Sequence, residues 1–311
     1  LPAEVVDARH ANEASRFLVL DDGTRIHYRD QGPRAARPLV LLHGANASLH
    51  AFEPWVALLD RSHRVVTLDL PAHGLTGATA SGDYSTAGQL RTVDAVVDHL
   101  GLGRFVLGGH SMGGGVAYRY ALERRDRLTA MLLIDSVGLP QFTDSGGAPA
   151  DVGLPGWRWL RPLLRYANPR LLAGPVARLA YHDPELVTEA LIRRYCDLAL
   201  REGTRAAILA RLDLLREESP APPVDPRRLD LPTLVMWGAE DALIPVQMAY
   251  RFHAALPDAE LVVFPDLGHV PMEEDPGRTV RPLLEFLDTL DVPADGRPAT
   301  GPVRAGAFDP S

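Results

Sequence analysis

This chain of 311 residues contains a single cysteine, Cys196, and therefore cannot form an internal disulfide. Its 11 histidines are scattered, with neither a His-Glu-x-x-His motif nor a Cys/His cluster, so the sequence predicts no metal site. Basic residues are outnumbered, 32 against 40, and the net charge of −8 argues against a nucleic-acid partner. No apolar run is long enough to span a bilayer, so the sequence predicts no transmembrane segment.

The composition is that of a globular protein, with 46% hydrophobic and 23% charged residues. Cys196 lies in a helix-like stretch and is expected to be a packed thiol. The chain begins at Leu1-Pro2 without a methionine. The sequence leaves open a cytoplasmic protein or an exported one whose N-terminal signal or anchor was removed, and it leaves the oligomeric state open.

Short apolar segments alternate with helical patterns over most of the chain. Residues 16–20 and 25–29 flank Asp21-Asp22-Gly23, which predicts a β-hairpin. Continuous apolar strands separated by helices favour a mostly parallel sheet with helices on both faces, the α/β class. The further expected strands are 39–42, 65–68, 105–108, 128–134, 233–237 and 261–264, and the clearest helices are 86–100, 247–256 and 277–290.

The alternation stops after the sixth strand and resumes near residue 229. Residues 137–228 read as helices and loops only and end in the proline-rich stretch 220–226. We therefore predict an α/β core made of residues 1–136 and 229–291, with a helical insert at 137–228. Residues 292–311 are rich in proline, glycine and alanine and are expected to be a disordered tail.

The pentapeptide Gly109-His110-Ser111-Met112-Gly113 joins an apolar, strand-like run to a small-residue, helix-like run. A serine on a sharp strand-to-helix turn needs strained backbone angles, and Gly109 and Gly113 would let the strand and helix approach. Such a turn exposes the hydroxyl beside a helix N-terminus, which favours developing negative charge. The sequence thus predicts that Ser111 is a catalytic nucleophile.

A serine hydroxyl needs a base, and the base needs an acid that orients it. Asp241 follows a late strand, and His269 lies in the loop after the last strand of the core. The carboxyl ends of parallel strands meet at one edge of the sheet, so we expect His269 to be the base and Asp241 the acid. Glu240 and Asp135 are the rival candidates for the acid.

The segment His43-Gly44-Ala45 follows another apolar strand. An oxyanion hole needs two backbone N–H groups directed at one oxygen. We expect these to come from Met112, directly after the nucleophile, and from Ala45. Gly44 would permit the turn, and His43 would support the loop.

Together these motifs resemble the α/β-hydrolase superfamily, with matching features from about residue 16 to residue 290. The matches are His43-Gly44, Asp69-Leu70-Pro71-Ala72-His73-Gly74, the elbow around Ser111, Trp237-Gly238-Ala239-Glu240-Asp241 and Gly268-His269. Ala72 stands where the family usually has glycine. The resemblance implies that residues 137–228 form a cap over the active site.

The expected activity is cofactor-free hydrolysis of a small apolar carboxylic ester through an acyl-enzyme on Ser111. Aromatic residues of the insert, such as Trp157, indicate an apolar pocket, although each alone is expected to pack onto the core. Similar sequences include carbon–carbon bond hydrolases, lactonases and haloperoxidase-like enzymes, and some family members only bind ligands. The carbon–carbon hydrolases often have asparagine before the serine, so His110 leans toward esterases.

Overall fold

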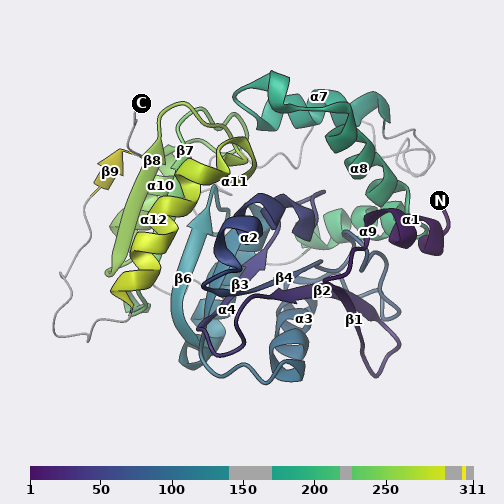
Figure 1. The fold of residues 1–311 in the computed structure, drawn as a ribbon, viewed down its shortest axis with the longest axis horizontal. Coiled ribbons are helices and arrows are strands. Elements are labelled where there is room, and N and C mark those ends of the chain that lie inside the picture. Colours follow the sequence, from purple (N-terminus) through teal and green to yellow (C-terminus); the bar gives the residue numbers. More distant parts are fainter. Residues whose placement is uncertain (140–169, 218–225, 291–302, 306–311) are drawn as a thin grey trace.

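The computed structural model describes residues 1–139, 170–217, 226–290 and 303–305 (Figure 1). The described residues form one nine-stranded sheet in the order β1-β2-β4-β3-β5-β6-β7-β8-β9. The strands are β1 (Ser15–Val19), β2 (Arg25–Gln31), β3 (Pro38–Leu42), β4 (Arg64–Leu68), β5 (Phe105–His110), β6 (Leu128–Ile134), β7 (Thr233–Gly238), β8 (Ala259–Phe264) and β9 (Val303–Ala305).

The sheet is mostly parallel, which confirms the predicted fold class. Only the β1–β2 and β2–β4 pairs are antiparallel, and every pair from β4 to β9 is parallel. The predicted hairpin joins β1 to β2, with Gly23 at a φ of 82° and the Asp22 carboxylate accepting the Thr24 N–H at 2.8 Å. A left-handed φ of this kind is the conformation for which glycine is suited.

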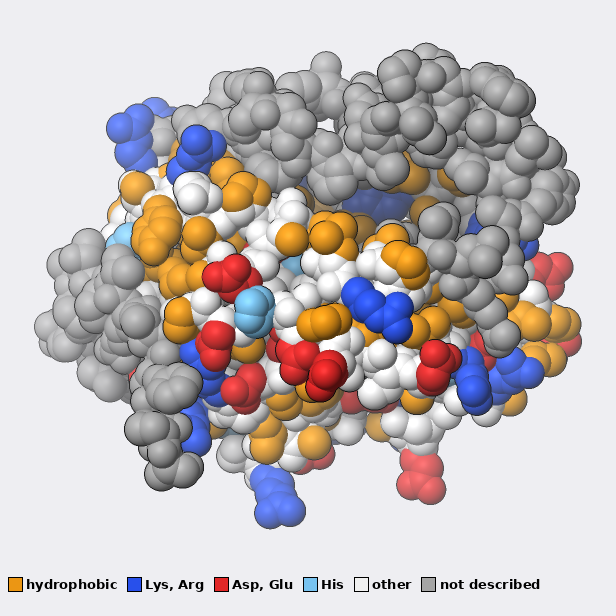
Figure 2. All heavy atoms as spheres, turned by 90° about the horizontal axis from the view of Figure 1, so that it is seen from above, with side chains coloured by type: hydrophobic (Ala, Val, Ile, Leu, Met, Phe, Trp, Pro, Cys, Tyr) orange, Lys and Arg blue, Asp and Glu red, His pale blue; other side chains and the backbone are white. Residues whose placement is uncertain are grey.

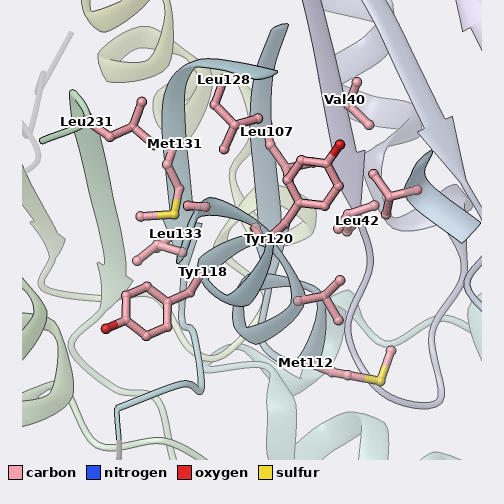
Figure 3. Close-up of a cluster of buried hydrophobic side chains, with 14 of the residues drawn as sticks. Val40, Leu42, Leu107, Met112, Tyr118, Tyr120, Leu128, Met131, Leu133 and Leu231 are labelled. Atoms are coloured by element: carbon pink, nitrogen blue, oxygen red, sulfur yellow. The ribbon is translucent and has the colours of Figure 1, made fainter. Parts of the chain in front are cut away.

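Helices cover both faces of the sheet because successive strand residues point to opposite sides. On one face, Val40 and Leu42 of β3 join a buried hydrophobic cluster that is covered by α3 (residues 86–99), α4 (residues 112–124) and α10 (residues 247–255), and Figure 3 shows part of this cluster. On the opposite face, Leu39 and Leu41 join a second buried cluster that is covered by α2 (residues 53–59) and α12 (residues 276–289). Each fully buried leucine contributes roughly 2 kcal/mol of hydrophobic stabilisation. The helices are α1 (Ala3–His10), α2 (Glu53–Leu59), α3 (Thr86–His99), α4 (Met112–Arg124), α10 (Gln247–Ala255), α11 (Pro271–Glu274) and α12 (Pro276–Thr289).

The described part of the predicted insert is helical. It contains α7 (Arg170–Ala180), α8 (Glu189–Leu200) and α9 (Thr204–Glu217), and Figure 1 shows α7 and α8 above the end toward which β6 points. Cys196 is fully buried in α8. Trp157, the other residues of 140–169 and most of the proline-rich stretch lie outside the described residues, so the boundaries of the insert stay a prediction.

Two elements differ from the sequence-based expectation. The N-terminal helix α1 was not expected, since its residues lack a clear apolar face. Within the tail expected to be disordered, Val303–Ala305 forms β9, which pairs in parallel with β8 through Leu261, Val262 and Val263. Three residues are too short for hydrophobic periodicity to reveal, and the pairing depends on an edge that only the folded sheet offers.

The described surface carries mixed charge. On the face in Figure 2, acidic and basic side chains are interspersed with apolar ones, and the described residues of this face form no continuous basic surface. Within the same described ranges, none of the helices combines the length and the apolar character needed to cross a membrane.

Candidate active site

Four neighbouring parallel strands end at the same edge of the sheet. Ser111 directly follows β5, and Asp135 directly follows β6. Asp241 lies in the loop after β7, and His269 lies in the loop after β8. Because β5, β6, β7 and β8 are adjacent in this order, their carboxyl ends collect these side chains in one place.

Ser111 occupies a strained turn between β5 and α4. Its backbone has a φ of 53° and a ψ of −114°, a left-handed φ that is uncommon for a residue with a side chain. The Ser111 N–H donates to the carbonyl of Ile134 at 2.8 Å, which fixes the turn to β6. A Cβ on Gly109 would overlap the Gly113 backbone, and a Cβ on Gly113 would overlap the carbonyl of Leu42. The two glycines therefore allow the approach that the turn requires.

His269 and Asp241 form a buried hydrogen-bonded pair. The distance from His269 Nδ1 to Asp241 Oδ2 is 2.7 Å, and the two residues are only 5% and 7% exposed. The other carboxylate oxygen of Asp241 accepts the N–H groups of Leu243 at 2.7 Å and Ile244 at 2.9 Å. Three donors therefore converge on one carboxylate and hold it in place.

His110 connects the nucleophile turn to the His269 loop. Its ring lies 4.8 Å from the His269 ring, and its Nε2 donates to the His269 carbonyl at 2.7 Å. Burial holds the pKa of His110 well below its usual value, so this ring stays neutral. Among the described residues, no hydrogen bond joins Ser111 Oγ directly to His269, and the contact between the two segments is made by His110, the neighbour of Ser111.

The rival acids differ sharply in their surroundings. Glu240 is exposed, whereas Asp135 is completely buried and accepts the Gly238 N–H through Oδ1 at 3.0 Å. One ligand atom each of Asp135, Asp241 and His269 lie within 4.8 Å of one another, a spacing that a metal ion could also use. The His269 nitrogen in this group faces a carboxylate at 2.7 Å, however, and so carries the proton rather than a free lone pair.

The expected oxyanion loop lies against the nucleophile turn. A Cβ on Gly44 would crowd the His110 ring, 2.7 Å from Nδ1, so only glycine fits this close approach. His43 is fully buried, and its ring accepts the Leu70 N–H at 3.0 Å and donates to the Gly44 carbonyl at 2.7 Å. Neither the Ala45 N–H nor the Met112 N–H donates a hydrogen bond to another described residue. Within the described part of the chain, both amides are therefore left without a protein acceptor, and their role as an oxyanion hole stays a prediction.

A second Ser-His-Asp row runs from β1 through β2 to Asp69, the first residue of the loop that resembles the family motif at residues 69–74. His27 Nδ1 is 2.7 Å from Asp69 Oδ2, and His27 Nε2 is 2.9 Å from Ser15 Oγ. Ser15, however, is a strand residue without the turn that exposes Ser111. Asp69 also accepts the N–H groups of Leu49 at 2.7 Å and Leu75 at 2.8 Å. These hydrogen bonds connect β1, β2 and the loops at Leu49 and Leu75 through Asp69, so we assign this row a structural role.

Ala72 in the same loop departs from the family's glycine. Its φ is 71°, in the left-handed region that glycine adopts without steric cost. The Ala72 methyl is buried against Tyr84 and against Ala207 of α9. The methyl thus gives the insert a contact that glycine would lack.

The insert also contacts the loop that carries His269. The His269 N–H donates to the Ala180 carbonyl at the end of α7, at 2.7 Å. The Glu274 carboxylate accepts the Gly268 N–H at 2.7 Å and the His182 N–H at 2.8 Å. These contacts leave no signal in the sequence, because no local pattern indicates which segment of an insert lies beside a distant loop.

A family model described as alpha/beta hydrolase fold matches residues 37–276. The chain belongs to the α/β-hydrolase family. This α/β-hydrolase is 30% identical over 273 residues to the dihydrolipoyllysine-residue acetyltransferase component of the acetoin cleaving system of Pseudomonas putida, covering 85% of this chain and 67% of that protein. It is 26% identical over 291 residues to the 2-hydroxy-6-oxo-6-(2'-aminophenyl)hexa-2,4-dienoic acid hydrolase of Metapseudomonas resinovorans, covering 92% and 95%.

A solved structure shows the same fold. The esterase RhEst1 from Rhodococcus sp. ECU1013 aligns with a TM-score of 0.70 and 26% identity, over 89% of this α/β-hydrolase and 99% of that chain. The similar proteins thus include hydrolases with different substrates. The bond that this chain cleaves therefore has to be argued from the site.

Proposed function

We propose that this α/β-hydrolase is a serine hydrolase that cleaves carboxylic esters through an acyl-enzyme on Ser111. The observation that carries the proposal is the 2.7 Å hydrogen bond from His269 Nδ1 to Asp241, formed beside a serine with a φ of 53°. A buried, charge-assisted bond of this kind fixes the imidazole tautomer that leaves Nε2 free to take a proton.

In the proposed first step, His269 Nε2 takes the hydroxyl proton as Ser111 Oγ attacks the ester carbonyl. The carbonyl π electrons move to the oxygen, which becomes the oxyanion. The open N–H groups of Ala45 and Met112 would bind it, and losing one such donor typically costs about 10²–10³-fold in kcat. The tetrahedral intermediate then expels the alkoxide, which receives the proton from His269 and leaves as the alcohol.

In the second step, a water gives its proton to His269 Nε2 as its oxygen attacks the acyl carbonyl. The second tetrahedral intermediate expels Ser111 Oγ, which takes the proton back, and the carboxylic acid leaves. Asp241 remains ionised throughout and stabilises the imidazolium in both steps. The sequence of steps uses no cofactor and acts on a small apolar ester.

A second candidate is carbon–carbon bond hydrolysis, which the similarity to a hydroxy-oxo-dienoic acid hydrolase favours. The residue before the nucleophile argues for esters instead. His110 is packed against His269, and its Nε2 is occupied by the His269 carbonyl at 2.7 Å. His110 therefore differs from the asparagine that carbon–carbon hydrolases often have before the serine.

The experiment compares two substrates with the wild type and Ser111→Ala. We expect p-nitrophenyl butyrate to be hydrolysed with a kcat/KM at least ~100-fold above that for a 2-hydroxy-6-oxo-dienoic acid, and Ser111→Ala to lose about 10⁴-fold or more. Preference for the dienoic acid would establish the second candidate. Ester hydrolysis that survives in Ser111→Ala would contradict the nucleophile assignment.

A further inference from the structure

We propose that Asp135 is a neutral carboxylic acid in the folded enzyme and donates a hydrogen bond from Oδ2 to Asp241. It would act as a positioning residue for the acid of the triad. The inference rests on the proposed function for its catalytic meaning, whereas the protonation itself can be measured without a substrate.

The contacts of the two carboxyl groups decide where the proton lies. Asp241 receives N–H donors from Leu243 at 2.7 Å, Ile244 at 2.9 Å and His269 at 2.7 Å. Asp135 receives one, from Gly238 at 3.0 Å, and its Oδ2 is buried with no donor among the described residues. The carboxyl group with three donors is the better anion, so the pair holds its one proton on Asp135 Oδ2.

The surroundings of Asp135 oppose a second negative charge. The residue is completely buried at the end of β6, with a φ of 44°. The ionisable groups that face it are Asp241 after β7, His269 after β8 and Glu274 of α11. Burial first, and then the charge of Asp241, raise the pKa of Asp135 well above its usual value. Two carboxylates this close in a dry site cannot both be ionised.

The proton on Asp135 has a consequence for the reaction. The Asp135 hydroxyl would be a fourth hydrogen-bond donor to the Asp241 carboxylate, in addition to the N–H groups of Leu243, Ile244 and His269. The pair then carries one negative charge instead of two beside His269. The arrangement would thus hold Asp241 in the position from which it orients the His269 ring.

Asp135→Asn tests the protonation through stability alone. Asparagine tolerates a positive φ, keeps an acceptor for Gly238 and carries an N–H donor where the acid has its proton. Above pH ~4 the unfolded wild type releases the Asp135 proton and the folded protein keeps it, so the contribution of Asp135 to wild-type stability falls as pH rises. We expect the folding equilibrium constant of Asp135→Asn, relative to wild type, to rise about tenfold per pH unit between about pH 5 and 7. A ratio that does not change with pH would overturn the proposal.

Activity gives the second readout, with Asp135→Gly as the variant that lacks a donor but accepts the same backbone angle. We expect Asp135→Asn to keep kcat within ~3-fold of the wild-type value and to leave the acidic limb of the pH profile of kcat/KM unchanged. We expect Asp135→Gly to lose about tenfold in kcat. If Asp135 were ionised, removing its charge at about 5 Å would move the acidic limb down by about two pH units. That shift would overturn the proposal.

The two proposals fail in different ways. A wild type without Ser111-dependent esterase activity would contradict the proposed function and leave the stability test intact. If Asp135→Asn does not fold, ¹³C NMR of the aspartate carboxyl groups in the wild type replaces it. One aspartate that stays protonated at pH 7 supports the proposal, and full ionisation of all of them overturns it.

Discussion

Glu274 joins the loop that carries His269 to the helical insert, and replacing it measures how far the insert positions that histidine. Its carboxylate accepts three backbone N–H groups, from Gly268 at 2.7 Å, His182 at 2.8 Å and Asp183 at 3.4 Å. Gly268 belongs to the loop after β8, and the other two residues follow α7. One side chain therefore fastens two segments that are far apart in the sequence.

The cost of Glu274→Ala follows from these contacts. The buried Gly268 N–H would lose its acceptor, which costs about 1–3 kcal/mol, whereas His182 and Asp183 are exposed and can bind water instead. We expect the free energy of unfolding to fall by about 2 kcal/mol and Tm by about 4 °C. A freed His269 loop should lower kcat about 10-fold, because small displacements of a catalytic group are costly.

The assay combines thermal unfolding with ester hydrolysis at saturating substrate. Glu274→Gln keeps one acceptor oxygen and should show about half of the stability loss. Glu240→Ala, at an exposed carboxylate of the loop after β7, serves as the matched control and should resemble the wild type. If Glu274→Ala keeps both the Tm and the kcat of the wild type, the insert does not position His269 through this residue.

The other predictions concern the turn, the acid and the buried histidines. Gly113→Ala should abolish esterase activity, because the added Cβ would overlap the backbone of β3. Gly103→Ala is the control and should leave activity and Tm unchanged, because no atom lies within 4 Å of the added Cβ. Asp241→Asn should lower kcat about 10⁴-fold and Glu240→Gln less than ~2-fold, and the reverse order in steady-state kinetics would exchange their roles. Burial lowers the pKa of His73 to about 3, so the folded ring stays neutral while the unfolded chain takes up a proton below its ordinary value of 6.5. His73 alone therefore costs about 2 kcal/mol of stability at pH 5, and urea unfolding at pH 8 and 5 should show that His73→Gln loses about that much less stability between the two pH values than the wild type does.

The strand pattern and the nucleophile turn were predictable because both depend on local sequence. Apolar runs predict β3 to β8 to within two residues at each end, since strands buried on both faces need continuous apolar side chains. Ser111 was predictable because its turn needs small residues at fixed positions. The sheet order, in contrast, depends on long-range pairing that no window of residues contains.

The surroundings of the site were less predictable. Asp135 was recognised as a possible acid from its place after a strand, but its burial beside Asp241 depends on the adjacency of β6 and β7. From the sequence, His110 indicates only a substrate class, and its bond to the His269 carbonyl depends on the fold. Glu274 had no signal at all, because a single glutamate in a short helix resembles any solvated residue.

The central claim is that Ser111 is the nucleophile of a serine hydrolase, and covalent labelling tests it most directly. The wild type is incubated with a fluorophosphonate, and the modified residue is located by peptide mass spectrometry. The account predicts one label per chain on Ser111, loss of esterase activity in step with labelling, and no label in Ser111→Ala. A label on another residue, or ester hydrolysis that continues in a fully labelled enzyme, would contradict it.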